Sequence, residues 1–309
     1  MGMTPRQLKY FVEIARSGSI TTAAATLHIA QPALSHHIAA MEEELGVPLL
    51  QRHARGVRLT MEGQRLFDRA ASILRQMERL REDVRDAASE FRGVVRACIV
   101  GSVAPVLVVP LYRLIQERAP EVQLHLTTAM SREAQTLVEA RRVDLALLPT
   151  ASEMSKLESR PAYEEDFCLF GTREQMGNAT GDIAFREIGD RPLVEPDREH
   201  DLRKLIERTA VALDCPLNVL YEVNSSDLLR SMVCGGLAFA VMPRNSFPTF
   251  EARGIAARRI VEPVLSRTQS VVWSVDQPLT PACHLVRDLL LELIAQLLAD
   301  GQLVGRTLP

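Results

Sequence analysis

Four hydrogen-bonding side chains lie on one face of a predicted helix near the N-terminus, where they could bond the edges of DNA bases. They are Gln31, Ser35, His36 and His37. A glutamine can make two hydrogen bonds to adenine, and a serine can bond several groups. The opposite face is apolar at helical spacing, with Leu34, Ile38, Met41 and Leu45. This pattern predicts a helix that buries one face and offers the other to a ligand.

The chain before this helix supplies the elements that must position it. Residues 19–28 are predicted to form a shorter helix with Ser19 as its N-cap, and Pro32 fixes the start of the next helix, because proline fits only the first turn. Two short helices joined by a tight turn are the layout of a helix-turn-helix, whose second helix enters the major groove of DNA. An earlier helix is predicted between a cap at Thr4 and a stop at Gly18.

A basic hairpin is predicted directly after these helices. Residues 47–60 contain two short apolar runs on either side of a turn that includes Gly56, which is typical of a β-hairpin wing. Arg52, Arg55 and Arg58 lie in this segment and suit contacts to phosphates or the minor groove.

The segment 61–91 is predicted to be the longest helix of the chain. Its apolar residues alternate in steps of four and three, at Leu66, Ala70, Ile73, Met77, Leu80, Val84, Ala87 and Phe91. This heptad seam favours a two-chain coiled coil, with Leu66, Ile73, Met77, Leu80 and Val84 in the dimer contact. The alternative is an amphipathic helix that packs on its own domain.

The remainder of the chain alternates between predicted strands and helices. Strands at 94–100, 122–127 and 143–148, with helices between them, predict a parallel α/β sheet. A second set of such elements follows, so we expect two α/β lobes, with the chain crossing between them near 162–166 and 264–269. A ligand would bind in the cleft at the carboxyl ends of the strands.

Composition limits the class of protein. The 309 residues are 47% hydrophobic and 24% charged, which is ordinary for a globular chain of two or three domains. The sequence lacks a long apolar run and a secretory segment, so we expect a cytoplasmic protein with no membrane partner. The five widely spaced cysteines predict reduced thiols. We expect no metal site and no cofactor, and the lack of hydrolase, nucleotide-binding and zinc-protease motifs predicts that the protein is not an enzyme.

Segments along the whole chain resemble the LysR-type transcriptional regulators. The specific matches are residues 18–24, the motif Ala30-Gln31-Pro32-Ala33-Leu34-Ser35, and residues 45–52. Residues 144–147 and 235–243 add weaker matches. Within the family, residues 8–12 and 27–30 look like the nitrogen-assimilation-control subgroup.

The resemblance implies a specific architecture. We expect a winged helix-turn-helix domain over 1–60, a coiled-coil linker helix over 61–92, and a two-lobed effector domain over 93–309 that is similar to periplasmic binding proteins. Lobe I would take residues 93–163 and 267–300, and lobe II residues 164–266. The family further implies promoter DNA as partner, a homotetramer built as a dimer of dimers, contact with RNA polymerase, and a small effector in the interlobe cleft.

The resemblance also assigns the DNA-binding residues. Gln31, Pro32, Ser35 and His36 would reach base edges or adjacent phosphates, and Arg55, with Arg52, would contact the groove beside the wing. Many relatives carry Arg or Gln where His36 stands. A neutral histidine makes one bond at a time and cannot fork onto guanine as arginine does, so a different base preference is a hypothesis.

Six residues of the two lobes are candidates for effector contact. They are Ser102, Ser131, Glu195, His200, Asn224 and Ser225. The three serines precede or begin predicted helices, so each could hold an effector or act only as a helix cap. We expect Glu195 and His200 at the rim of the cleft, where Glu195 would repel a carboxylate.

Two other functions remain open from the sequence. One is a LysR-type regulator that needs no effector, and the other is a cytosolic small-molecule binding protein, as the two lobes alone would suggest. The predicted helix-turn-helix favours a DNA-binding regulator over the second.

Overall fold

The computed structural model describes residues 3–53, 56–85, 91–149, 154–177 and 179–308. The chain divides into two compact units, residues 1–88 and 89–309, and each is described by itself. Within the described residues, no helix is long and apolar enough to cross a membrane.

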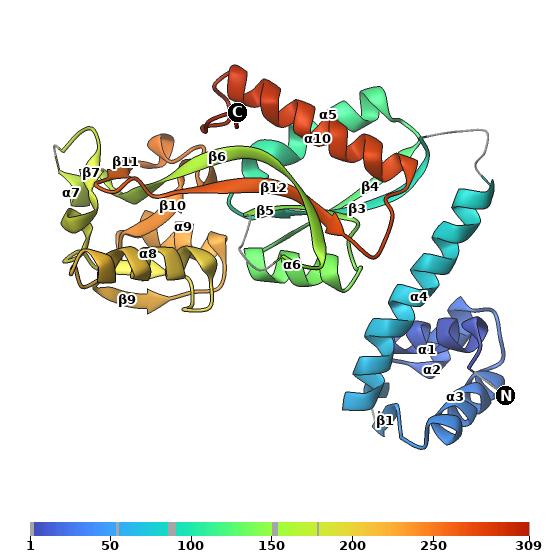
Figure 1. Ribbon diagram of the computed structural model, residues 1–309. Coiled ribbons are helices and arrows are strands. Elements are labelled where there is room, and N and C mark those ends of the chain that lie inside the picture. The colour runs from blue at the N-terminus through green and yellow to red at the C-terminus, as the bar shows by residue number, and fades with distance from the viewer. Residues whose placement is uncertain (1–2, 54–55, 86–90, 150–153, 178, 309) are drawn as a thin grey trace. The chain divides into compact units, whose positions relative to one another are not determined.

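The first unit contains three short helices, a hairpin and a long helix (Figure 1). In order they are α1 (Pro5–Ser17), α2 (Ile20–Thr26), α3 (Gln31–Leu45), β1 (Leu50–His53), β2 (Gly56–Leu59) and α4 (Met61–Arg85). The predicted helix ends are confirmed: the Thr4 side chain caps α1, the left-handed Gly18 ends it, and Ser19 caps α2. The predicted wing is also confirmed, because β1 and β2 pair in antiparallel fashion.

The core of this unit is built from the apolar faces of its helices. Phe11, Ile14, Leu34 and Met41 are almost completely buried. Leu45 was expected on the same buried face, but it is 40% exposed. It is the last residue of α3, next to the left-handed Gly46, so it projects beyond the three-helix core.

The long helix begins as predicted and is described as far as Arg85. Phe91 lies in a turn outside α4 and is 48% exposed, so it does not continue the heptad seam. Leu66 packs against the core of the first unit, as the alternative interpretation of this helix proposed, whereas Ile73 is 45% exposed. The side chains of Leu80 and Val84 lie outside the described residues, so their role in a dimer stays a prediction.

Lobe I of the second unit contains the three predicted parallel strands. They are β3 (Gly93–Val100), β4 (Val122–Ala129) and β5 (Leu145–Pro149), with β3 between the other two. The helices α5 (Ala104–Arg118), α6 (Ser131–Glu139) and α10 (Pro281–Ala299) pack on this sheet, and their apolar faces form one core with it.

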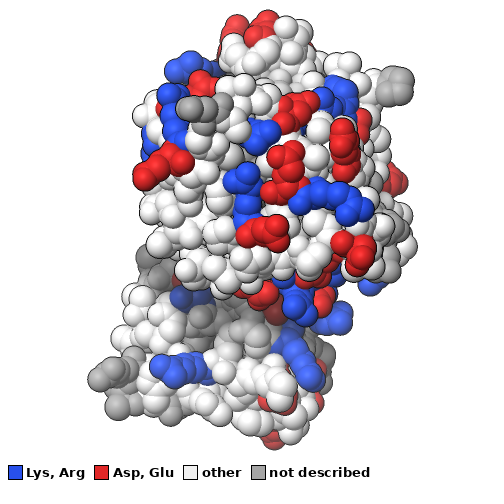
Figure 2. Space-filling model, turned by 90° about the vertical axis from the view of Figure 1, so that its left-hand side faces the viewer, with Lys and Arg blue, Asp and Glu red and all other residues white. Residues whose placement is uncertain are grey.

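Lobe II contains shorter elements arranged around the far half of a long strand. They are α7 (Arg173–Met176), β7 (Ile183–Ala184), β8 (Leu193–Glu195), α8 (Asp201–Ala212), β9 (Val219–Glu222), α9 (Ser226–Cys234), β10 (Ala240–Pro243) and β11 (Ile255–Val261). The sequence did not predict β11, because Arg258 and Arg259 interrupt its apolar pattern. Acidic and basic side chains are interspersed on the face of this unit seen in Figure 2.

Two long strands carry the chain between the lobes. β6 (Leu157–Thr172) and β12 (Ser266–Ser274) pair in antiparallel fashion from Asp166 and Ser266 to Leu157 and Ser274. The expected crossing segments therefore form one hydrogen-bonded ribbon, which Figure 1 shows running through both lobes. Since β12 is also antiparallel to β5, the sheet is mixed and not purely parallel as predicted.

Gly63, near the start of α4, packs closely against the backbone just before the wing. A Cβ at Gly63 would lie 2.1 Å from the carbonyl oxygen of Leu49. We expect Gly63→Ala to lower the free energy of unfolding of the first unit by about 1–3 kcal/mol, because a backbone atom must move to relieve the overlap. Thermal unfolding and hydrogen exchange of α1–α4 would measure it. Gln64→Ala, at an exposed neighbour, is the control, and equal stability of both variants would contradict this packing.

Candidate DNA-binding helix and interlobe cleft

The first turns of α3 present the side chains that the sequence assigned to DNA. Gln31, Pro32 and His36 are exposed. The N-cap residue, Ala30, makes no side-chain hydrogen bond to the helix. The first backbone N–H groups of α3 are therefore not capped by that residue, and a phosphate is a suitable acceptor for them.

Ser35 lies differently from the expectation. Its hydroxyl oxygen is covered and has no hydrogen-bond partner among the described residues. It would need to rotate about χ1 to reach a base edge, and its present orientation leaves a buried polar atom unsatisfied.

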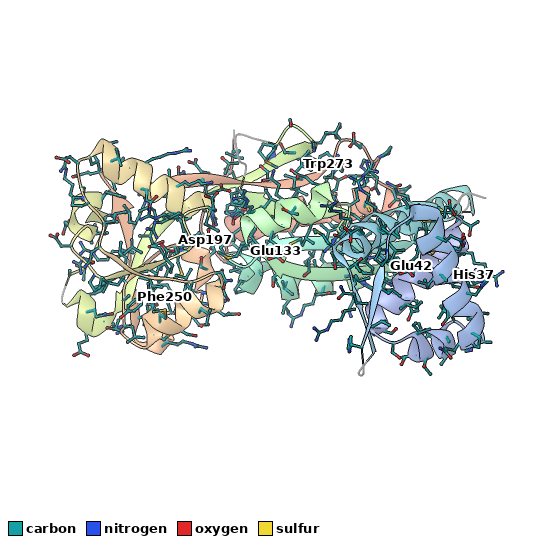
Figure 3. The ribbon with its side chains drawn as sticks, turned by 90° about the horizontal axis from the view of Figure 1, so that it is seen from below. His37, Glu42, Glu133, Asp197, Phe250 and Trp273 are labelled. Atoms are coloured by element: carbon teal, nitrogen blue, oxygen red, sulfur yellow. The ribbon has the colours of Figure 1, made fainter. Side chains whose placement is uncertain are left out.

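Contacts from neighbouring elements fix the position of α3. The Glu42 carboxylate accepts hydrogen bonds from the backbone N–H groups of Leu49, at 2.7 Å, and Leu50, at 3.1 Å, which ties the helix to the wing. On the other side, the His37 ring lies 5.1 Å from the ring of Tyr10 in α1. Figure 3 shows His37 and Glu42 along the same helix. The helix is therefore held at both sides, which keeps the geometry of its exposed turn constant.

Of the three arginines expected on the wing, the structure describes the side chain of one. Arg58 is exposed on β2. Arg55 and the side chain of Arg52 lie outside the described residues. The hairpin is joined to α1 through the N–H of Val57, which donates to the carbonyl of Gly18 at 2.9 Å.

A small cavity, with about 30 Å³ of enclosed space, lies between the two lobes and is lined by residues from both. Of the predicted effector residues, it brings together Ser102, Ser131 and His200. An adjoining, larger cavity of about 420 Å³ is lined by Asn224 and Ser225. The structure thus places five of the six candidates at the cleft and excludes Glu195.

The three serines have different surroundings. Ser225 caps α9, since its hydroxyl accepts from the N–H of Asp227 at 3.2 Å. Ser102 precedes the N-cap of α5 and caps nothing; its hydroxyl accepts from Arg267 Nη2 at 2.9 Å. Ser131 is the first residue of α6 and is buried at the cavity wall. Helix capping therefore accounts for Ser225 alone.

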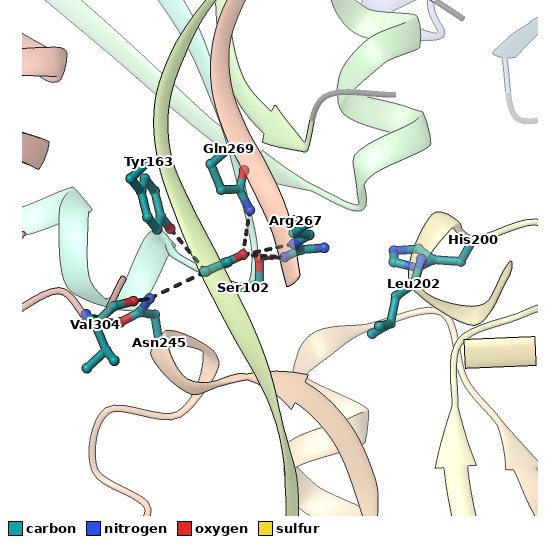
Figure 4. A network of polar contacts seen from close by, with 9 residues as sticks. Ser102, Tyr163, His200, Leu202, Asn245, Arg267, Gln269 and Val304 are labelled. Atoms are coloured by element: carbon teal, nitrogen blue, oxygen red, sulfur yellow. Dashed lines mark hydrogen bonds and ion pairs between the residues drawn. The ribbon is translucent and has the colours of Figure 1, made fainter. Parts of the chain in front are cut away.

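The sequence did not predict the role of Arg267, which lines the same cavity. Its Nε donates to Glu165 Oε1 at 2.8 Å, and Gln269 Nε2 donates to the same oxygen at 2.7 Å. On the other carboxylate oxygen, Tyr163 donates at 3.1 Å and Asn245 at 3.4 Å (Figure 4). The only sequence signal was a pair of opposite charges, Glu165 and Arg267, in the two crossing segments.

His200 faces this network from lobe II (Figure 4). Its Nδ1 accepts a hydrogen bond from the N–H of Leu202 at 3.2 Å, so the ring hydrogen is on Nε2. Burial, helped by the positive charge of Arg267, lowers the pKa of His200 to about 4. The ring is therefore neutral near pH 7, and its Nε2–H is a hydrogen-bond donor at the cavity wall.

Glu195 does not lie at the rim of the cleft, which corrects the expectation. It is completely buried in lobe II, where Oε1 accepts from the N–H of Val241 at 2.9 Å. Its other oxygen has no hydrogen-bond partner among the described residues. Burial raises the pKa of Glu195 to about 8, so the group is mostly protonated at neutral pH and cannot repel a carboxylate in the cleft.

The cysteines and histidines show no further chemistry. All five cysteines, which lie among the described residues, are free thiols, and burial raises the pKa of Cys98 to about 12. Across the described parts of the chain, no group of three or more His, Cys, Asp or Glu side chains could hold a metal ion.

Comparison with known proteins finds a family match in each of two segments of the chain. Residues 5–64 match the bacterial regulatory helix-turn-helix protein family of the lysR type, and residues 88–295 match the LysR substrate binding domain. The nitrogen assimilation regulatory protein nac of Klebsiella aerogenes is 31% identical over 95% of this chain and 96% of its own length. The Escherichia coli protein of that name is 29% identical over 95% of this chain and 96% of its own.

Solved structures show the same fold. A full-length OxyR variant from Pseudomonas aeruginosa has a TM-score of 0.71 and 23% identity, and the match covers 95% of each chain. CbnR complexed with its target DNA also has a TM-score of 0.71, with 22% identity, and the match covers 95% of this chain and 99% of that one.

The fold and the exposed recognition helix define a DNA-binding transcriptional regulator with an effector-binding domain. The chain belongs to the LysR family. The resemblance to the nitrogen-assimilation regulators is confirmed, and the relatives are regulators and not enzymes, as the sequence predicted.

The buried Glu195 predicts an unusual pH dependence of stability. A glutamic acid whose pKa rises from 4.5 to about 8 on folding stabilises the protein below pH 4.5, and this contribution is lost as the pH rises towards 8. Glu195→Gln keeps the acceptor for Val241 and removes the titration. We expect its free energy of unfolding, relative to the parent, to increase between pH 5 and pH 7 by about 2 kcal/mol.

Urea unfolding at several pH values would measure this difference. Glu139→Gln, at an exposed position on α6, is the control and should leave the pH profile unchanged. A Glu195→Gln profile parallel to that of the parent would show that the buried carboxyl does not titrate in this range.

Proposed function

We propose that this protein is an effector-responsive regulator that binds promoter DNA through α3 and the wing and a small molecule in the cavity between its lobes. The observation that carries the proposal is the convergence of hydrogen-bond donors from separate segments on one cavity. Arg267 comes from the crossing strand β12, His200 from lobe II, and Ser102 and Ser131 from lobe I. A ligand with acceptor atoms could bond several of them at once.

The chemistry of the cavity limits the ligand. Arg267 is already paired with Glu165, at 2.8 Å, so the cavity offers directed N–H and O–H donors with little net positive charge. The enclosed space is only about 30 Å³, well below the usual range for ligand sites, so a ligand would have to open the cavity or extend into the adjoining one. We therefore propose a compact effector with a carboxylate or carbonyl group that lies between Arg267 and His200.

We propose that the effector acts through the angle between the lobes. A ligand that bonds both lobes favours the arrangement in which its partners are close, and only this difference in affinity can shift the equilibrium. The change would pass to DNA through a dimer formed by α4, with Ile73, Met77, Leu80 and Val84 at its contact, and through a dimer of dimers that contacts RNA polymerase. Bound to bacterial promoter DNA, the protein would work in the cytoplasm.

The residues that we propose for DNA contact are Gln31, Pro32, Ser35 and His36 on α3 and Arg52 and Arg55 on the wing. The exposure of the first turn of α3 supports DNA contact by the residues on this helix. Arg58, exposed on the same hairpin, is a further candidate for a phosphate.

A second candidate is a regulator of the same family that needs no effector. It is favoured by one observation: Glu165 and Ser102 already occupy donors of Arg267, so the cavity partly satisfies itself without a ligand. In that case the lobes would serve assembly alone.

The two candidates differ in the effect of a cavity variant. His200→Asn keeps a side chain that can cap α8 but removes the imidazole Nε2–H from the cavity wall. DNase footprinting upstream of the protein's own gene, with and without small mono- and dicarboxylates, would compare it with the parent. We expect an acid that shifts the parent footprint to need about tenfold higher concentration with the variant, for the loss of one hydrogen bond.

Thr280→Asn is the matched control, because it replaces the N-cap residue of α10, away from the cleft. Its footprint should respond to the acids as that of the parent does. Footprints that no acid alters, in parent or variants, would favour the effector-independent regulator. The absence of any footprint from folded protein at low salt would overturn DNA binding itself.

His36 and Arg58 should differ in what they contribute to DNA binding. We expect His36→Ala to change the base preferred at one position of selected binding sites, at a cost of about 1–3 kcal/mol to the original site. Arg58→Ala should weaken all sequences equally and reduce the salt dependence by about one phosphate contact. Site selection and salt titrations would measure both, and an unchanged site sequence with His36→Ala would exclude base contact by this residue.

A further inference from the structure

The end of the chain runs back along the ribbon that joins the lobes. After α10 and the left-handed Gly301, Leu303 is buried in the core of lobe I. The next residues lie beside β6, where the N–H of Arg306 donates to the carbonyl of Glu164 at 2.7 Å and the N–H of Glu164 donates to the carbonyl of Arg306 at 2.9 Å. The tail, defined as residues 301–306, thus forms a β-bridge to the ribbon.

A side chain that follows β10 of lobe II holds the same tail. The carboxamide of Asn245 accepts from the N–H of Val304 at 2.9 Å and donates to the carbonyl of Val304 at 2.8 Å. Asn245 is 3% exposed, so both bonds are shielded from water. Since Leu303 is fixed in lobe I and Val304 is held by Asn245, consecutive residues of the tail join the two lobes.

The arrangement needs a glycine at the contact. A Cβ at Gly305 would lie 2.7 Å from the carbonyl oxygen of Glu164 and 2.7 Å from Tyr163 Cδ2. No larger residue could bring the tail this close to β6. Beyond the glycine, Arg306 forms ion pairs with Asp166 at 2.7 Å and Glu164 at 3.1 Å. These pairs are partly exposed, so they add less than the buried amide bonds.

The tail is also connected to the cavity through buried groups. Asn245 Nδ2 lies 3.4 Å from Glu165 Oε2, and Glu165 Oε1 holds Arg267, which lines the cavity. A movement of the tail would therefore change the surroundings of the carboxylate that positions Arg267 (Figure 4).

We propose that the tail is a further connection between the lobes, beside the two strands of the ribbon, which limits their relative movement and so affects how far the cleft opens. A ribbon of two strands can bend and twist, and hinge motions in two-lobed proteins are absorbed by such short connections. A third segment, fixed to lobe I by Leu303 and to lobe II by Asn245, opposes that bending. The proposal concerns the movement of the lobes and does not depend on a ligand in the cleft.

Gly305→Ala is the most direct test in the full-length protein. We expect its Cβ to lift the tail from β6, so that amide hydrogen exchange at Glu164 and Arg306 becomes at least about tenfold faster. Exchange should also rise in the ribbon near Tyr163–Asp166 and Ser266–Gln269. Val304→Ala is the matched control, because the Val304 side chain is 46% exposed and the tail is held there through its backbone.

A distance measurement separates loss of the connection from simple fraying of the tail. Spin labels at Glu139→Cys in lobe I and Arg208→Cys in lobe II, with Cys234→Ser in every variant, report the distribution of distances between lobes. We expect this distribution to broaden with Gly305→Ala, which lifts the tail but leaves the side chains of Asn245 and Glu165 in place, and not with Val304→Ala. Faster exchange confined to the tail, with an unchanged distance distribution, would overturn the proposal.

Discussion

The second unit depends on one buried charge, the carboxylate of Glu165. This side chain is 1% exposed, and a buried carboxylate is costly unless hydrogen bonds and an opposite charge compensate it. The compensation comes from distant parts of the chain, because Tyr163 is on β6, Arg267 and Gln269 are on β12, and Asn245 follows β10. Removing any of these donors would take away part of this compensation, so the carboxylate favours the arrangement in which the lobes bring all of them together.

The first unit is specified in a different way, by signals that are local in sequence. Thr4 and Ser19 as caps, and Gly18 and Gly46 as left-handed stops, fix where the helices begin and end. Such signals act within a few residues, and those at Thr4, Gly18 and Ser19 were predicted correctly from the sequence. The same holds for the strands and helices of lobe I, whose apolar periodicity reflects a single buried core.

The errors of sequence prediction arose where the structure depends on contacts between distant residues. Glu195 ends a strand, where cleft residues are expected, but its side chain is buried and accepts a hydrogen bond from the N–H of Val241. The local sequence does not reveal this contact. Likewise, Glu165 and Arg267 are predicted only as charges in two crossing segments, and nothing in either segment shows that they pair. Leu66 matches a heptad position, yet a core of its own unit is also within reach.

The internal pairing of Arg267 changes how the cleft would distinguish ligands. An unpaired arginine would attract any anion, whereas one that already faces Glu165 gains little from a further negative charge. In the proposed site, selectivity would then depend on the direction of the hydrogen bonds, because the acceptor atoms of a ligand would have to meet donors fixed by β12, by His200 and by the start of α6. Because these elements belong to both lobes, the angle between the lobes would determine how well a ligand fits, and a bound ligand would in turn favour one angle.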